Sequence, residues 1–229
     1  MALSAIAKLQ HEIAQCEKCP RLREHCRHIA EVKRRAYLDW EYWGKPVPSF
    51  GDEKARLLLI GLAPGAHGAN RTGQMFTGDA SGDFLFRTMH KAGFASQPTC
   101  RTKADGLRLI DAYITGSGRC APPDNKPHPG ELANCRPYLE QELKLLKNVK
   151  VIVVLGRIAF DTYLSILRDQ RLITKPTDYK FEHGAVLDLQ PRVICSYHPS
   201  QQNTQTGRLT EGMFFDVFET ARELIREKL

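Results

Sequence analysis

The chain has 229 residues, enough for one large domain or two small ones with a buried core. Apolar residues make up 42% and charged residues 26%, and no apolar run approaches the roughly 20 residues of a membrane-spanning helix. The formal net charge of +7 favours polyanionic partners, chiefly nucleic acid, although basic proteins of other classes share this balance. Lysine and arginine are frequent between residues 18 and 35.

The N-terminal segment does not resemble a secretion signal, because no basic stretch precedes a continuous apolar core. We therefore expect a cytoplasmic protein. Apolar residues recur there at the spacing of one face of an amphipathic helix: Leu3, Ile6, Leu9 and Ile13. Residues 1–50 are predicted to form a helical extension that packs on the rest of a single domain spanning residues 1–229.

Short apolar segments rich in β-branched or aromatic residues predict four buried strands, at residues 55–62, 109–115, 149–155 and 192–197. Amphipathic segments predict helices at residues 83–92, 130–147, 157–171 and 212–228. Strands that alternate with helices form parallel βαβ units with right-handed crossovers. The sequence therefore predicts an α/β fold, a three-layer α/β/α sandwich.

Residues 61–82 form the most informative segment, GLAPGAHGANRTGQMFTGDASG, which has six glycines among 22 residues. This glycine content rules out a regular helix and lets the backbone approach a ligand closely. Other unusual loops follow the remaining strands: TGSGRCAPPDNKP at 115–127, LGR at 155–157 and SYHPS at 196–200. Because ligands bind beyond the carboxyl ends of parallel strands, we expect the four loops to line one cleft.

Seven cysteines lie at positions 16, 19, 26, 100, 120, 135 and 195, and without a secretion signal we expect no disulfide framework. The short Cys16–Cys19 spacing is typical of metal or cluster ligation, and Cys120 with Cys135 is the candidate second pair. Four thiolates suit zinc or an iron–sulfur cluster, and the spacing does not separate the two. Cys26 is a rival ligand, and a Cys16–Cys19 pair without metal is the other alternative. Of the remaining two cysteines, Cys100 is expected in a loop and Cys195 in a buried strand.

The segments GLAPGAHGANRTGQMFTGD, CAPPDNKP and SYHPS, with the upstream Cys-x-x-Cys, resemble the family-5 or B-type uracil-DNA glycosylases of bacteria and archaea. The resemblance covers roughly residues 10–225. It implies a glycosylase fold around a four-stranded parallel sheet and the removal of uracil from DNA. It also implies activity on other deaminated bases, including hypoxanthine and xanthine. A 4Fe-4S cluster is implied, with ligands at Cys16, Cys19, Cys120 and Cys135.

A glycosylase must rotate the damaged nucleotide into a pocket before it breaks the N-glycosidic bond. The resemblance implies that Phe76 packs against the base, whereas the alternative is a core residue that anchors the loop. The amide of Asn125 matches the donor and acceptor edge of uracil, unless it forms an Asx turn. His198 is a candidate donor to the departing base, unless it is hydrogen-bonded within its proline-containing turn.

The resemblance also points to His67, near the sugar or the leaving base, and to Asp79 as a catalytic acid. Asp79 could orient water or stabilise the sugar cation, but it and Ser81 equally suit the N-cap of the next helix. Related glycosylases carry a polar, water-activating residue near the position of Leu62 and Ala63. Its absence places more weight on Asp79 and predicts weaker discrimination between bases.

Backbone of the first loop is expected to contact the substrate at Gly61, Ala63 and Gly65. Contacts to DNA phosphates are expected from three arginines, Arg71, Arg157 and Arg208, with anchoring by Ser196 and Ser200. The polar segment 199–210, PSQQNTQTGRLT, is predicted to fill the gap left by the flipped base, or else to be a solvated loop.

The leading hypothesis is a monomeric, monofunctional DNA glycosylase of base excision repair, associated with the nucleoid and without a membrane partner. We expect its cluster to hold residues 10–30 and the Cys120–Cys135 region in place without a redox step. A nucleotide hydrolase is disfavoured because the motif G-x-x-x-x-G-K-S/T does not occur. A non-catalytic iron–sulfur or zinc DNA-binding module is the remaining alternative, but it leaves Phe76, Asn125 and His198 unexplained.

Overall fold

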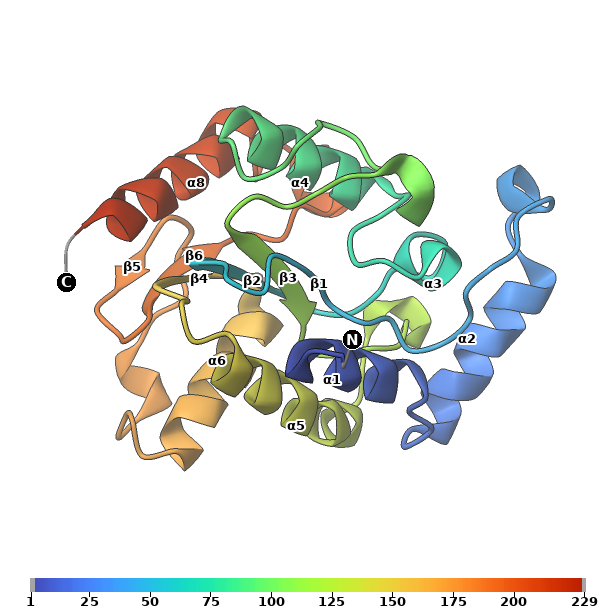
Figure 1. Cartoon of the computed structure of the whole chain (residues 1–229), viewed down its shortest axis with the longest axis horizontal. Helices are drawn as coiled ribbons and strands as arrows, with labels where there is room; N and C mark the ends of the chain where they lie inside the picture. Colours follow the sequence, from blue (N-terminus) through green and yellow to red (C-terminus); the bar gives the residue numbers. More distant parts are fainter. Residues whose placement is uncertain (1–2, 228–229) are drawn as a thin grey trace.

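The computed structural model describes residues 3–227. Its centre is a six-stranded sheet in the order β1-β3-β2-β4-β6-β5 (Figure 1). The four inner strands are parallel, as predicted: β2 (Leu57–Gly61), β3 (Ala112–Gly116), β4 (Val151–Leu155) and β6 (Arg192–Ser196). The edge strands β1 (Phe50–Gly51) and β5 (Val186–Leu187) pair antiparallel and were not predicted, because two residues show no periodicity.

Helices cover both faces of the sheet and confirm the three layers. One face carries α4 (Ala80–Lys91) and α8 (Glu211–Arg226), and the other carries α1 (Ala5–Ala14), α5 (Pro129–Leu145) and α6 (Arg157–Asp169) (Figure 1). All residues of β2 are buried, with Leu57 and Leu59 in one core and Leu58 and Ile60 in the other. Burial on both faces explains the continuous apolar runs of the inner strands.

Most element boundaries differ from the prediction by one or two residues, and the two largest differences have local reasons. The expectation that glycines exclude a helix from residues 61–82 was wrong in part, because the short helix α3 (Ala69–Thr72) forms there. Helix α4 begins before residue 83, because Asp79 caps it by accepting a hydrogen bond from the Gly82 amide at 2.9 Å. Strand β3 begins after residue 109, because Asp111 has a φ of +54° and Leu109 forms an isolated bridge with Ala95 instead. The last residue of the predicted C-terminal helix, 228, lies outside the described residues.

The N-terminal extension contains α1, α2 (Pro20–Val32) and the 3-10 turn η1 (Arg35–Tyr37). Ile6, Leu9 and Ile13 are buried, as the helical spacing predicted. The prediction for Leu3 was wrong: it precedes the N-cap Ser4 and is 63% exposed. Helix α1 packs on α5, and α2 lies beyond the edge of the three layers (Figure 1).

A buried polar network ties the extension to the sheet and to α5. Arg119 and Glu142 form an ion pair of 2.7 Å, and both side chains are almost fully buried. Glu142 also accepts hydrogen bonds from Thr115 at 2.5 Å and from Gln10 at 3.1 Å. These partners satisfy a carboxylate that would otherwise be costly to bury.

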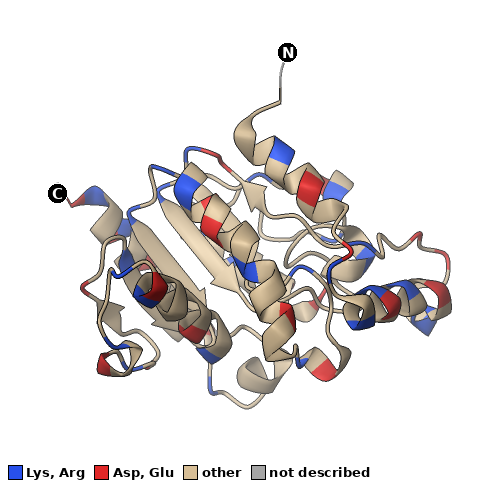
Figure 2. Ribbon diagram, turned by 90° about the horizontal axis from the view of Figure 1, so that it is seen from below, with Lys and Arg blue, Asp and Glu red and all other residues tan. Residues whose placement is uncertain are grey.

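The basic charge is spread over the molecule and interspersed with acidic residues (Figure 2). Within the basic N-terminal segment, Glu17 pairs with Arg23 and Arg27, and Arg21 pairs with Glu131 at 2.7 Å. Part of the cationic charge of this segment is therefore neutralised locally. Of the helices described, none has both the length and the apolar character needed to cross a bilayer.

Candidate active site

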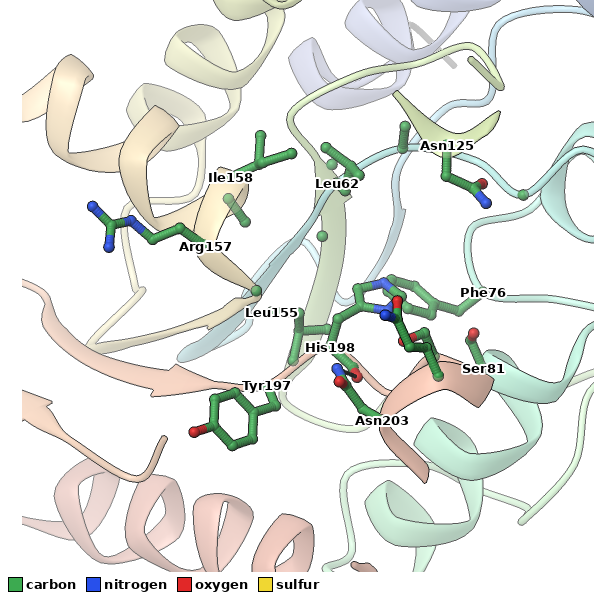
Figure 3. Close-up of a pocket in the computed structure, with 18 of the residues that line it drawn as sticks. Leu62, Phe76, Ser81, Asn125, Leu155, Arg157, Ile158, Tyr197, His198 and Asn203 are labelled. Atoms are coloured by element: carbon green, nitrogen blue, oxygen red, sulfur yellow. Dashed lines mark hydrogen bonds between the residues drawn. The ribbon is translucent and has the colours of Figure 1, made fainter. Parts of the chain in front are cut away.

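A cavity of about 480 Å³ opens at the carboxyl ends of the four parallel strands (Figure 3). The loops that follow β2, β3, β4 and β6 all contribute to it, as the topology predicted. Most of the predicted site residues line this cavity: Gly61, Ala63, Gly65, Phe76, Asp79, Asn125, Arg157, His198, Ser200 and Arg208.

Phe76 owes its position to two glycines. Its backbone has a φ of +54°, a conformation that is unfavourable for an aromatic residue. A Cβ on Gly61 would lie 3.0 Å from Cε2 and Cζ of the Phe76 ring, and a Cβ on Gly82 would overlap the Phe76 carbonyl oxygen. The glycines of this loop therefore let the ring lie directly against the end of β2.

His198 lies beside Phe76, and the two rings stack with centroids 5.7 Å apart and planes at 29° (Figure 3). Burial lowers the pKa of His198 to about 4, so the imidazole is neutral near pH 7. The His198 carbonyl accepts a hydrogen bond from Asn203 at 2.8 Å, whereas the ring has no hydrogen-bond partner among residues 3–227. An N–H of the ring is therefore available to a ligand.

Asp79 both caps α4 and lines the cavity. Its Oδ1 accepts the Gly82 amide, and its Oδ2 lies so close to Gly65 and Gly68 that a Cβ on Gly65 would be 2.9 Å away. Burial raises the pKa of this carboxyl group, while hydrogen bonds from the amides of Gly82 and Ser81 oppose the rise. Capping and a role in the cavity are therefore compatible, because they use different oxygens.

Asn125 ends the 3-10 turn η3 (Pro123–Asn125), in which Asp124 and Asn125 have φ values of +53° and +57°. Its exposed side chain makes no hydrogen bond with residues 3–227. An Asx turn to residue 127 is ruled out, because Pro127 has no N–H to donate. The strained turn thus presents a free amide to the cavity, as expected of backbone strain at a functional site.

The expectation that Arg71 contacts phosphate was wrong. Arg71 is 3% exposed, and its guanidinium donates to the carbonyls of His67 at 2.8 Å and Gly78 at 2.7 Å. The guanidinium carbon lies 3.9 Å from the Tyr37 ring centre and 4.0 Å from that of Trp40. Arg71 therefore braces the loop from inside and attaches it to the N-terminal extension.

His67 lies outside the lining of the cavity. Its Nδ1 is 3.1 Å from the Tyr42 hydroxyl oxygen, and burial together with nearby Arg34 and Arg71 lowers its pKa. Ser196 is also placed differently from the expectation, because it is fully buried and its hydroxyl donates to the Tyr197 carbonyl at 2.9 Å. Neither side chain faces the cavity in this structure.

Five of the cysteines gather between the extension and α5. Cys19, Cys26 and Cys120 share one apolar cluster, and Cys16 packs beside Tyr138. Burial raises the pKa of Cys135, and neighbouring Cys16 and Cys19 raise it further. Within residues 3–227, no three Cys, His, Asp or Glu side chains surround a position for a single metal ion. The ligands of an iron–sulfur cluster bind different iron atoms, so they need not converge on one point.

The other two cysteines lie where the sequence predicted. Cys195 is buried in β6, and burial raises its pKa to about 11. Cys100 is buried in a loop, where Thr77 and Gln74 donate to its sulfur at 3.7 and 3.5 Å. Neither thiol belongs to the gathering of five.

Sequence reasoning missed several residues of the cavity wall. Ile158 at the start of α6 and Tyr197 from the SYHPS segment line the cavity (Figure 3). Phe181, which precedes β5, also lines it. Tyr197 could have been found from its place at the strand end. Phe181 lies in a connection without a motif, and only the packing of that connection beside β6 brings it to the cavity.

The chain is similar to known proteins over most of its length. Residues 48–222 match the family model described as the uracil DNA glycosylase superfamily. A type-5 uracil-DNA glycosylase of Mycobacterium leprae is 47% identical over 223 residues, with 96% of each chain covered. The type-5 enzyme of Thermus thermophilus is 47% identical over 93% of this chain and 94% of its own. That of Pyrobaculum aerophilum is 40% identical over 92% of this chain and 89% of its own. A type-4 enzyme of Pyrobaculum aerophilum is 26% identical over 85% of this chain and 83% of its own. The chain therefore belongs to the uracil-DNA glycosylase superfamily, within its type-5 branch.

Proposed function

We propose that this protein is a monofunctional uracil-DNA glycosylase that flips a damaged nucleotide out of DNA and hydrolyses its N-glycosidic bond. One observation carries the proposal. A single cavity at the strand ends combines an aromatic ring, a free amide, a neutral imidazole and a carboxylate, from Phe76, Asn125, His198 and Asp79. A glycosylase needs such groups to hold the flipped base and to break its N-glycosidic bond.

In this mechanism Phe76 packs against the flipped base, and the Asn125 amide pairs with its donor and acceptor edge. As the glycosidic bond breaks, negative charge develops on the base. A neutral His198 N–H donates a hydrogen bond to the base oxygen that takes up this charge. Such a fixed donor in a partly buried site stabilises the transition state strongly, as an oxyanion hole does.

Asp79 is the proposed partner of the sugar cation and the attacking water. Its Oδ1 accepts a hydrogen bond from the Gly82 amide, whereas Oδ2 lies close to Gly65 and Gly68 of the first loop. Leu62 and Ala63 line the cavity with apolar groups, so they provide no rival base. Asp79 therefore supplies the carboxylate chemistry of the reaction.

We propose that the enzyme also accepts other deaminated bases, including hypoxanthine and xanthine. A cavity of about 480 Å³ leaves room beyond a pyrimidine, and its apolar wall at Leu62 and Ala63 offers few groups that would reject a purine. The test is release of each base from matched oligonucleotides. Release of uracil alone would contradict the broader range.

The proposed cofactor is a 4Fe-4S cluster held by Cys16, Cys19, Cys120 and Cys135. Their sulfurs suit iron chemically, and the electrostatic influence of Cys16 and Cys19 on Cys135 supports their proximity. The cluster would act as a structural cross-link between the extension and α5. Cys26 is the rival ligand, because it shares an apolar cluster with Cys19 and Cys120 and its thiol donates to the Ala121 carbonyl at 3.6 Å.

Iron content and visible absorbance test this ligand set. Cys135→Ser is expected to lose iron and to lower the melting temperature, whereas Cys26→Ser is the matched control that retains iron. Loss of iron in Cys26→Ser with retention in Cys135→Ser would contradict the assignment. Stoichiometric zinc instead of iron would favour the zinc alternative.

We further propose that the protein works as a monomer on nucleoid DNA in the cytoplasm. Its net charge of +7 supports a strong dependence of DNA affinity on salt. Light scattering of the eluted protein tests the monomeric state. The molar mass is expected to correspond to one protein copy, both for the free protein and for its complex with DNA.

The decisive assay incubates the protein with uracil-containing oligonucleotides and cleaves the abasic product with alkali. Asn125→Ala and His198→Ala are expected to lower turnover more than DNA affinity. Asn148→Ala is a matched control, because this residue lies away from the cavity and bonds to the Lys54 carbonyl. DNA binding without release of any base would favour the non-catalytic module.

A further inference from the structure

Five further residues line the cavity without a role in the mechanism above: Arg157, Ile158, Phe181, Tyr197 and Arg208. Tyr197 and His198 are neighbours in the chain, and their side chains point to different sides (Figure 3). The mechanism above uses His198 and leaves the Tyr197 side without a role.

An aromatic and cationic stack is built around Tyr197 at the wall of the cavity. The His183 ring lies parallel to the Tyr197 ring, with centroids 5.0 Å apart and planes at 18°. The Tyr197 amide donates to Nδ1 of His183 at 3.1 Å, which fixes the imidazole. The guanidinium carbon of Arg208 lies 4.5 Å from the centre of the same Tyr197 ring. His183, Tyr197 and Arg208 thus form a stack that ends at an exposed arginine.

The two arginines that line the cavity, Arg157 and Arg208, make different interactions. Arg157 is paired with Asp161 at 2.8 Å. Within the described part of the chain, the Arg208 guanidinium has no acidic or hydrogen-bonding partner. An arginine held by stacking keeps its N–H donors free for phosphate and a planar surface free for a base.

We propose that this stack binds the nucleotide that flanks the flipped one in the same strand. Flipping removes a stacking partner from that neighbouring base and brings its phosphate toward the mouth of the cavity. The base then stacks on the Arg208 guanidinium, and the phosphate accepts hydrogen bonds from its N–H groups. Arginine planes supported by aromatic rings stack unpaired bases in this way. The inference rests on the proposed base flipping.

The test measures whether affinity depends on the neighbouring base. The probes are single-stranded oligonucleotides with 2′-fluoro-2′-deoxyuridine, whose fluorine slows cleavage, and with either a normal nucleotide or an abasic tetrahydrofuran residue on the 5′ or 3′ side. Fluorescence anisotropy gives each Kd. For the natural chain we expect the abasic neighbour to weaken binding at least about five-fold on one side, as the loss of one stacked base should.

Two variants connect this effect to the stack. Arg208→Lys keeps the charge but loses the planar surface, so both probes are expected to bind equally; Tyr197→Leu, which removes the support, should behave similarly. Arg157→Lys is the matched control and should keep the full dependence. Melting temperatures verify that each variant is folded.

Either of two outcomes would overturn the inference: a natural chain that is insensitive to both abasic neighbours, or an Arg208→Lys variant as sensitive as the natural chain. Uracil release from an ordinary substrate is measured in parallel. Uracil release without neighbour dependence contradicts this inference alone, whereas no release contradicts the proposed function as well.

Discussion

The imidazole of His198 stacks on the ring of Phe76, with centroids 5.7 Å apart. These residues come from loops after different strands, β6 and β2, and both line the cavity. The contact means that the group that stacks on the base and the group that donates to it are positioned together. Changing one ring should therefore disturb the other.

We expect His198 to titrate at a pH well below that of an ordinary histidine. Because burial lowers its pKa to about 4, its NMR signals should not titrate between pH 8 and 5. The unfolded chain binds this proton near pH 6.5 and the folded chain only near 4, so the free energy of unfolding falls as pH drops through this window. His198→Gln should lack this part of the loss. Titration of His198 near pH 6.5 would contradict its burial.

Asp79 can be tested so that capping and catalysis separate. Asn is as good an N-cap as Asp, so Asp79→Asn should keep the stability of α4 while losing the carboxylate. Asp79→Ala loses both the cap and the carboxylate. Its free energy of unfolding should therefore be about 1 kcal/mol lower than that of Asp79→Asn. We expect turnover to fall in both variants. Full turnover in Asp79→Asn would show that the residue is only a cap.

Gly82 is expected to be needed for the position of Phe76. A Cβ at this position would overlap the Phe76 carbonyl oxygen, so Gly82→Ala should lower the free energy of unfolding by about 1–3 kcal/mol and reduce turnover. Gly130→Ala is the matched control, because no atom beyond its own helix backbone and chain neighbours lies within 4 Å of its added Cβ. Urea unfolding and the uracil assay measure the two effects. Equal behaviour of both variants would contradict the steric argument.

The buried Arg119–Glu142 pair should be a large local contribution to folding. Glu142→Gln leaves the Arg119 charge buried without a counter-charge, and we expect a loss of about 3–5 kcal/mol in the free energy of unfolding. The control is Asp161→Asn, which breaks the exposed pair with Arg157 and should change stability by less than about 1 kcal/mol. Because Thr115 of the cavity wall also donates to Glu142, turnover should fall with stability.

Much of the site was predictable from the sequence for a topological reason. Parallel strands put their following loops at one edge, so Phe76, Asn125 and His198 could be assigned to one cleft from their places after strands. The same reasoning failed for Arg71, whose neighbours Tyr37 and Trp40 come from the extension. The sequence spacing of Tyr37, Trp40 and Arg71 does not indicate that the Arg71 guanidinium packs against these two rings instead of facing solvent.

By itself, the sequence determined the parallel sheet, the helices that cover it and the family, because periodicity and short motifs are local properties of the chain. The tertiary structure decided which polar residues face the cavity and which support it. His67 and Arg71 lie in the same connection between β2 and α4 as Phe76, yet they bond to groups outside the cavity. The stack of His183, Tyr197 and Arg208 likewise joins residues from different loops, and their packing beside β6 brings Arg208 to the cavity wall, with no acidic partner among residues 3–227. Side-chain direction depends on contacts between distant segments, which no local pattern encodes.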